Sequence, residues 1–201
     1  MKKNLQSYSN FLLYISLVSI VLALLFFSIL QSKESESLQE NGVVSTQVRS
    51  IIKDGSQGME NKLNTIVQNT NQISKVEVYN VKDIDGYREV FDYVESVKPN
   101  FEYSRNFAFT SLFVDLLPSG NGDSNWYIVT ERRSFHTLSV LVLFLGVIFY
   151  WFSFTVWSLK KAYDQNRLNI GWVIVFMLFN IIGYSIFHLA NNRINSKQSF
   201  E

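Results

Sequence analysis

The sequence predicts an integral membrane protein with three transmembrane α-helices and a small extracytoplasmic α+β domain between the first and second helices. The first observation is that apolar residues gather in three blocks without Asp, Glu, Lys or Arg, at residues 11–30, 138–159 and 171–190. Twenty helical residues span about 30 Å, which matches the hydrocarbon core of a bilayer. The second observation is that residues 31–137, between the first two blocks, are polar and show both helical and strand periodicity.

The basic residues at the ends of the blocks predict the orientation of the chain. These topology determinants are Lys2, Lys3, Lys160, Lys161 and Arg167. They fall in residues 1–10 and in the short connector 160–170, whereas residues 31–137 carry 11 Lys and Arg against 15 Asp and Glu. Short basic loops stay in the cytoplasm. We therefore expect the N-terminus and the connector inside, residues 31–137 outside, and the C-terminal tail 191–201 outside.

The first block is interpreted as an uncleaved signal anchor. Its apolar run is longer than the roughly 7 to 15 residues of a signal peptide, and no small-residue cleavage site follows it. No Asn-x-Ser/Thr sequence occurs in residues 31–137, which is compatible with a bacterial source. We expect a multi-pass protein of the bacterial inner membrane, although Arg193 and Lys197 in the tail run against an outward C-terminus.

The outer segment divides into a stalk and a folded part. Residues 31–58 are polar and rich in serine, which predicts a stalk that is helical or partly flexible, and residues 59–137 predict the α+β domain. Apolar residues at three-and-four spacing predict a helix that begins at Met59. The further expected elements are a strand at 75–81, a helix over 85–97, a strand over 101–113, a turn at 118–125 and a strand at 126–131.

Composition excludes several classes of function. The net charge of +1 gives no electrostatic reason to bind nucleic-acid phosphates, and the absence of cysteine excludes disulfides, thiolate metal sites and cysteine nucleophiles. His136 and His188 are too few and too far apart to build a metal centre. Acidic residues around Gly86 do not make a calcium loop, because Val81 and Asp92 stand where its first and last ligands would be. We expect no enzymatic activity, no cofactor and no bound metal.

Polar residues inside the third block form the candidate interaction site. Asn180, Tyr184 and His188 follow one another at intervals of four, so they would share one face of a straight helix. Gly183 beside them allows another backbone to approach closely. Unpaired polar groups are costly in hydrocarbon, so this face should meet another helix. Packing within the bundle is favoured, and contact with a partner's helix or a translocation or proton path are the alternatives.

The C-terminal pair of apolar blocks carries a family resemblance. Trp172, Asn180, Gly183 and Tyr184 resemble the two-helix membrane hairpin found at the N-terminus of phospholipase D-type cardiolipin synthases and in small stand-alone membrane proteins, over residues 149–190. That pattern usually has Pro where this chain has Asn180. The H-x-K-x4-D signature of the superfamily is absent, so the resemblance implies a membrane hairpin and no phosphodiesterase activity.

Three functions from different classes fit these observations. The favoured one is a non-enzymatic membrane accessory or interaction subunit, whose outer domain binds a protein or ligand and whose helices dock on another membrane protein or a second copy of the chain. The second is an extracytoplasmic sensing protein that relays through its membrane helices to a separate cytoplasmic partner. The third is an immunity-type protein or a component of a small pore or transporter. All three place the chain in a lipid bilayer and give it no nucleic-acid partner.

Overall fold

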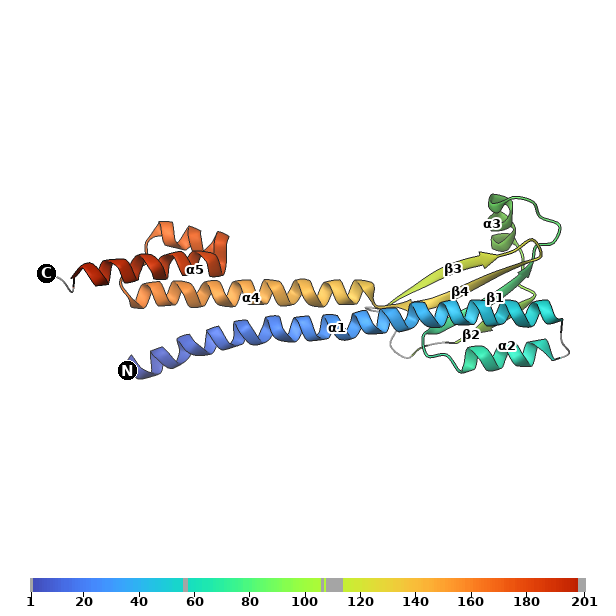
Figure 1. Ribbon diagram of the computed structural model, residues 1–201, viewed down its shortest axis with the longest axis horizontal. Coiled ribbons are helices and arrows are strands. Elements are labelled where there is room, and N and C mark those ends of the chain that lie inside the picture. The colour runs from blue at the N-terminus through green and yellow to red at the C-terminus, as the bar shows by residue number, and fades with distance from the viewer. Residues whose placement is uncertain (1, 56–57, 106, 108–113, 199–201) are drawn as a thin grey trace. The chain divides into compact units, whose positions relative to one another are not determined.

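The computed structural model confirms three long apolar helices with an α+β segment between the first and the second of them (Figure 1). It describes residues 2–55, 58–105, 107 and 114–198. The elements are α1 (Lys2–Asp54), α2 (Met59–Gln68), β1 (Ile73–Asn80), α3 (Tyr87–Ser96), β2 (Phe101–Ser104), β3 (Asp115–Gly122), β4 (Trp126–Ser134), α4 (His136–Asp164) and α5 (Ile170–Gln198). Three helices, at 10–54, 136–164 and 170–191, are long and apolar enough to cross a membrane by length and composition. Residues 28–140 form one compact unit, and residues 1–27 with 141–201 form the other.

The unit of residues 28–140, which we call the outer domain after its expected position, is built on a four-stranded antiparallel sheet in the order β2-β1-β4-β3. Its strands differ from the expectation in two places. The strand expected over 101–113 ends at Ser104. Phe107 lies outside any strand, and Phe109 and Phe113 fall outside the described residues. The expected turn at 118–125 is in large part strand, because β3 runs through Pro118 to Gly122. Proline is tolerated there because β3 is an edge strand and needs no donor on its open side.

One face of the sheet is covered by α1 and α2 and holds the main core. The buried members of this core are Val44, Val48, Ile52, Leu63, Val67, Ile73, Val76, Val78, Phe101 and Ile128. Three of them, Val44, Val48 and Ile52, belong to the segment 31–58 that was expected to be a stalk. Residues 31–54 of that segment continue the helix of the first apolar block, and their buried face makes them a part of the domain and not a separate support.

The opposite face of the sheet is covered by α3. Tyr79, Val81 and Tyr127 are buried there against the apolar side of the helix. The ring of Phe91 meets the ring of Tyr127 edge-on, with centroids 5.8 Å apart. The strand pattern therefore has apolar side chains on both faces, which gives a three-layer arrangement of helix, sheet and helices.

The third apolar segment does not run straight. Asn180 has φ 46° and ψ −117°, which breaks α5 into two helical limbs. Across this break the rings of Trp172 and Phe187 have centroids 5.0 Å apart, although 15 residues of a straight helix would separate them by about 22 Å. Figure 1 shows the two limbs side by side. The prediction of an apolar helix over 171–190 is confirmed, and the structure adds that this helix is interrupted at Asn180.

We expect the core position Val48 to matter for the stability of the outer domain and the α1 surface position Val43 not to. Val48 is 0% exposed and Val43 is 47% exposed. Val48→Ala should lower the free energy of unfolding by about 2 kcal/mol, because it leaves a cavity under the sheet. Val43→Ala should change it little. Pulse proteolysis of the full chain in mild detergent measures both, and equal effects of the two variants would contradict the buried position of this helix face.

Candidate functional site

Asn180 lies at the turn of the α5 hairpin and ties it to α4. Its Nδ2 donates to the carbonyl oxygen of Trp151 at 3.1 Å and to Oγ1 of Thr155 at 3.2 Å, and the residue is 2% exposed. In return, Nε1 of Trp151 donates to the carbonyl oxygen of Met177 at 3.1 Å. Asparagine tolerates positive φ better than most residues, and its amide supplies the donors that an apolar residue would lack.

The other predicted residues of this block pack the hairpin. A Cβ on Gly183 would stand 2.7 Å from the carbonyl oxygen of Val175, so only glycine lets the two limbs come this close. Tyr184 has its ring centroid 4.5 Å from that of Trp157 on α4, and it stacks on His188 at 6.3 Å. Asn180 does not share a helix face with Tyr184 and His188, because the backbone at Asn180 is not helical. The single polar stripe expected from the sequence is thus divided between the turn and one limb.

The basic residues that predict the orientation lie at helix ends. Lys2 and Lys3 begin α1, and Lys161 lies in the last turn of α4. Lys160 pairs with Asp164 one turn later, with Nζ and Oδ2 3.4 Å apart. The amide of Arg167 donates to the carbonyl oxygen of Ala162, which closes the end of α4. Cations at the carboxyl end of a helix are favourable.

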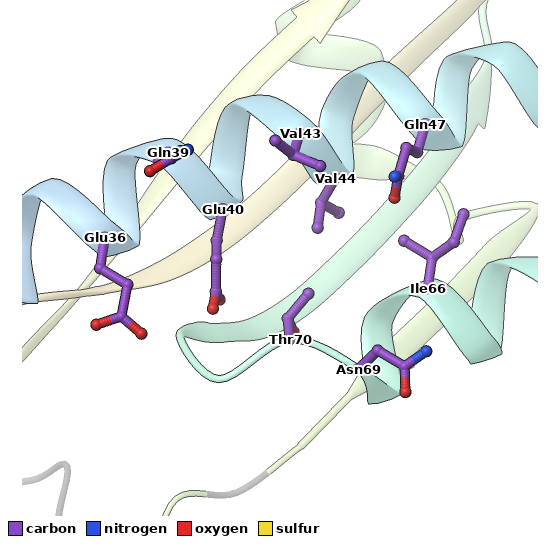
Figure 2. A pocket seen from close by; sticks show the side chains of 9 residues that line it. All are labelled: Glu36, Gln39, Glu40, Val43, Val44, Gln47, Ile66, Asn69 and Thr70. Atoms are coloured by element: carbon purple, nitrogen blue, oxygen red, sulfur yellow. The ribbon is translucent and has the colours of Figure 1, made fainter.

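A groove in the outer domain runs between α1 and the end of α2, and it has a volume of about 270 Å³. It is lined by Glu36, Gln39, Glu40, Val43, Val44, Gln47, Ile66, Asn69 and Thr70. Figure 2 shows Val44 and Ile66 facing one another across its floor, with the carboxylates of Glu36 and Glu40 at one end. The groove therefore combines an apolar floor with amide groups and two carboxylates.

The two carboxylates of the groove have different partners. Glu40 accepts hydrogen bonds from the amides of Asn71 and Gln72, the latter at 2.7 Å, so it holds the loop that leads into β1. Glu36 is bound to the exposed Nζ of Lys33 at 2.6 Å. That hydrogen bond holds the pKa of Glu36 below its ordinary value. Glu36 is thus the carboxylate that can exchange its lysine for another cation.

A buried ion pair within the outer domain joins α1 to the end of β4. Nη1 of Arg132 lies 2.8 Å from Oε1 of Glu34, and their side chains are 11% and 13% exposed. Oε2 of Glu34 accepts from the amide of Phe135 at 2.6 Å and from Oγ of Ser134 at 3.1 Å. Burial alone would raise the pKa of Glu34, but the hydrogen bonds from Phe135 and Arg132 and the charge of Arg132 outweigh it and lower that pKa.

Sequence reasoning missed both the groove and this ion pair. Glu34 and Arg132 are 98 positions apart, and nothing local relates them. One pattern could have revealed the buried face of α1. Val44, Val48 and Ile52 recur every four residues inside a stretch that is mostly polar, and this spacing is typical of a helix that buries one side.

Comparisons with protein-family models, curated proteins and solved structures each found no match. Within the described ranges of the chain, no three His, Asp or Glu side chains come together in a way that could hold a metal ion. The candidate sites are therefore the groove, the Glu34–Arg132 ion pair and the α5 hairpin.

The Glu34 ion pair generates a prediction about stability and pH. Glu34→Gln should lower the free energy of unfolding at pH 7 by about 3 kcal/mol, because it leaves the buried Arg132 without its counter-charge. A carboxyl whose pKa is lowered by folding contributes stability above its unfolded pKa and loses it as the pH falls through its folded value. The difference between Glu34→Gln and the unchanged chain should therefore shrink below about pH 4.

Glu36→Gln is the matched control for this measurement. It removes a carboxylate two residues away whose lysine partner is exposed, so it should change the stability little. Urea unfolding of the full chain in detergent at pH 7 and pH 3 gives both numbers. Equal stability of Glu34→Gln and the unchanged chain at pH 7 would show that the pair does not hold the junction.

Proposed function

We propose that this protein is a non-enzymatic membrane accessory subunit, whose outer domain binds a protein segment or small ligand in the groove between α1 and α2. Its apolar helices would dock on another membrane protein. The observation that carries this proposal is that α1 forms one wall of the groove and is also the first membrane helix. An apolar floor with amide and carboxylate groups suits a ligand with an apolar side chain and a basic group.

A sensing protein is the second candidate, and the same helix favours it. Because α1 is unbroken from Lys2 to Asp54, an occupant of the groove would contact the helix that enters the membrane. β4 likewise passes into α4 with only Phe135 between them. A ligand with different affinities for two positions of α1 would shift the population of those positions. Such a protein would need a separate cytoplasmic partner to receive the change.

The groove proposal predicts a position-specific crosslink. A photoactivatable amino acid at Gln47, which lines the groove, should give a discrete adduct when the full chain is illuminated in the cells that produce it. The same substitution at Ser50, exposed on α1 and outside the groove, is the control and should give none. Adducts of equal yield at both positions, or none at Gln47, would count against the groove as a binding site.

For the membrane arrangement, we propose a cytoplasmic N-terminus, residues 31–137 outside, a cytoplasmic connector 160–170 and a re-entrant α5 hairpin. The apolar limb of α5 before Asn180 has ten residues, Ile170–Phe179, and rises only about 15 Å, half of the hydrocarbon core. A chain that enters and turns back in this way returns the tail to the cytoplasm. This revises the expectation of an outward tail, and it brings the basic residues of the tail into agreement with the positive-inside rule.

Single cysteines test this arrangement, because the chain has none of its own. In intact cells an impermeant thiol reagent should label Ser119→Cys, which is exposed on β3. Tyr163→Cys, 69% exposed at the end of α4, and Glu201→Cys in the tail should be labelled only after the membrane is permeabilised. Labelling of Glu201→Cys in intact cells, with Tyr163→Cys protected, would mean that α5 crosses the membrane.

A further inference from the structure

Two arginines from separate parts of the outer domain converge on one aromatic ring. The guanidinium of Arg105, just after β2, lies 4.5 Å from the ring centroid of Phe107, and that of Arg133, on β4, lies 4.7 Å from the same centroid. Arg133 also lies 5.1 Å from the ring of Phe135. Nη2 of Arg105 donates to the carbonyl oxygens of Thr70 and Ile73, at 2.8 and 3.1 Å, so this side chain is held in place. The two cations form what we call the arginine pair.

No carboxylate neutralises the arginine pair within the described part of the chain. Neither arginine takes part in any of the ion pairs there, and the Nε atoms of both are buried without a hydrogen-bond partner. Glu131, two residues before Arg133 on the same side of β4, accepts a hydrogen bond from Oγ of Ser74 at 2.6 Å. Asp115 accepts one from Thr137. The adjoining stretch 106–113 contains no Asp or Glu.

The closeness of the two arginines affects the pKa of Arg133. Burial lowers the pKa of its guanidinium, and the nearby charge of Arg105 lowers it further. Two like charges that are partly removed from water and lack a counter-ion are unfavourable. By contrast, Arg132 next along the strand has its carboxylate in Glu34. An anion bound from outside would remove the repulsion and supply acceptors for the free N–H groups.

The position along the chain indicates where such an anion would come from. Arg133 lies two residues before Phe135 and three before His136, where α4 begins, and the uncharged apolar run begins at Leu138. Arginines at this distance from the apolar run lie at the level of the headgroups, where phosphate groups are concentrated. Phe135 lies between them and the apolar run, as aromatic residues do at a membrane interface.

We propose that Arg105 and Arg133 form a binding site for a phosphate group at the outer surface of the membrane. The position of the site favours the phosphate of an anionic phospholipid over free phosphate. A guanidinium binds phosphate oxygens through two parallel N–H bonds, and two of them can grip one tetrahedral group from different directions. The arginine pair would then anchor the outer domain to the lipid headgroups next to the start of α4.

The test uses the full chain in mild detergent, with native mass spectrometry to measure how tightly phosphatidylglycerol binds. Arg133→Gln should weaken binding about tenfold, because one charge-assisted contact is lost. Arg105→Gln should act in the same direction, and Arg133→Lys should lie between Arg133→Gln and the unchanged chain. Arg88→Gln, which removes an exposed cation on α3, is the matched control and should leave the affinity unchanged.

Competing ligands distinguish the sources of the phosphate. Diacylglycerol, which has the same tails and no phosphate, should not compete, and inorganic phosphate should compete only weakly. Competition by inorganic phosphate as strong as that by phosphatidylglycerol would assign the site to free phosphate instead of lipid. Equal affinity of the unchanged chain, Arg133→Gln and Arg105→Gln for phosphatidylglycerol would overturn the proposal.

The stability of Arg133→Gln to urea distinguishes an effect of the substitution on binding from an effect on folding. Without added phosphate, Arg133→Gln should be no less stable to urea than the unchanged chain, because it relieves the repulsion within the arginine pair. Phosphatidylglycerol should stabilise the unchanged chain and not Arg133→Gln. If Arg133→Gln were less stable under both conditions to the same extent, the arginine would serve the fold alone and the proposal would fail.

Discussion

The helix α1 continues without a break from the apolar residues around Leu17 and Leu25 into the core of the outer domain. The same helix is therefore suited to lipid in its first half and to the core of a folded domain in its second half. In its first half the apolar side chains are largely exposed, as suits a helix surrounded by lipid. In its second half Val44, Val48 and Ile52 are buried under the sheet, and most of the other positions are polar. The outer domain has no complete core without this helix. Its fold, its groove and its attachment to the membrane therefore depend on the same element.

The end of β4 shows how a strand can give two neighbouring arginines different roles. Side chains alternate between the faces of a sheet, so Arg132 points toward α1 and reaches Glu34, while Arg133 lies against Phe107 and Phe135. The buried pair with Glu34 stabilises the junction between α1 and β4. Arg133 has no such counter-charge among the described residues, which leaves it available to a ligand. Because side chains alternate along β4, Arg132 stabilises the fold while Arg133 is a candidate for binding a ligand.

The membrane hairpin depends on satisfying polar groups in a place without water. A break in a helix frees backbone groups that hydrocarbon cannot hydrogen-bond. In α5 the break is held against α4 by the side chain of Asn180, which donates to Trp151 and Thr155, and by the indole of Trp151, which donates to Met177. Gly183 lets the limbs approach closely. These contacts satisfy Nδ2 of Asn180, whereas its Oδ1 is buried without a hydrogen-bond partner.

The three apolar segments, the α+β character of the region between the first two and most of its helices and strands could be predicted from the sequence. Those features follow from local periodicity and from the length of uncharged runs, which are properties of neighbouring residues. The sequence did not reveal that Val44, Val48 and Ile52 complete the core, that Glu34 meets Arg132, or that Arg105 meets Arg133. These contacts depend on the folded chain, because each one joins residues far apart in the sequence through the pairing of strands and the packing of helices. The path of α5 also depends on tertiary contacts. A polar residue in an apolar run is compatible with a straight helix, and only the backbone conformation at Asn180 and its hydrogen bonds to α4 reveal the break.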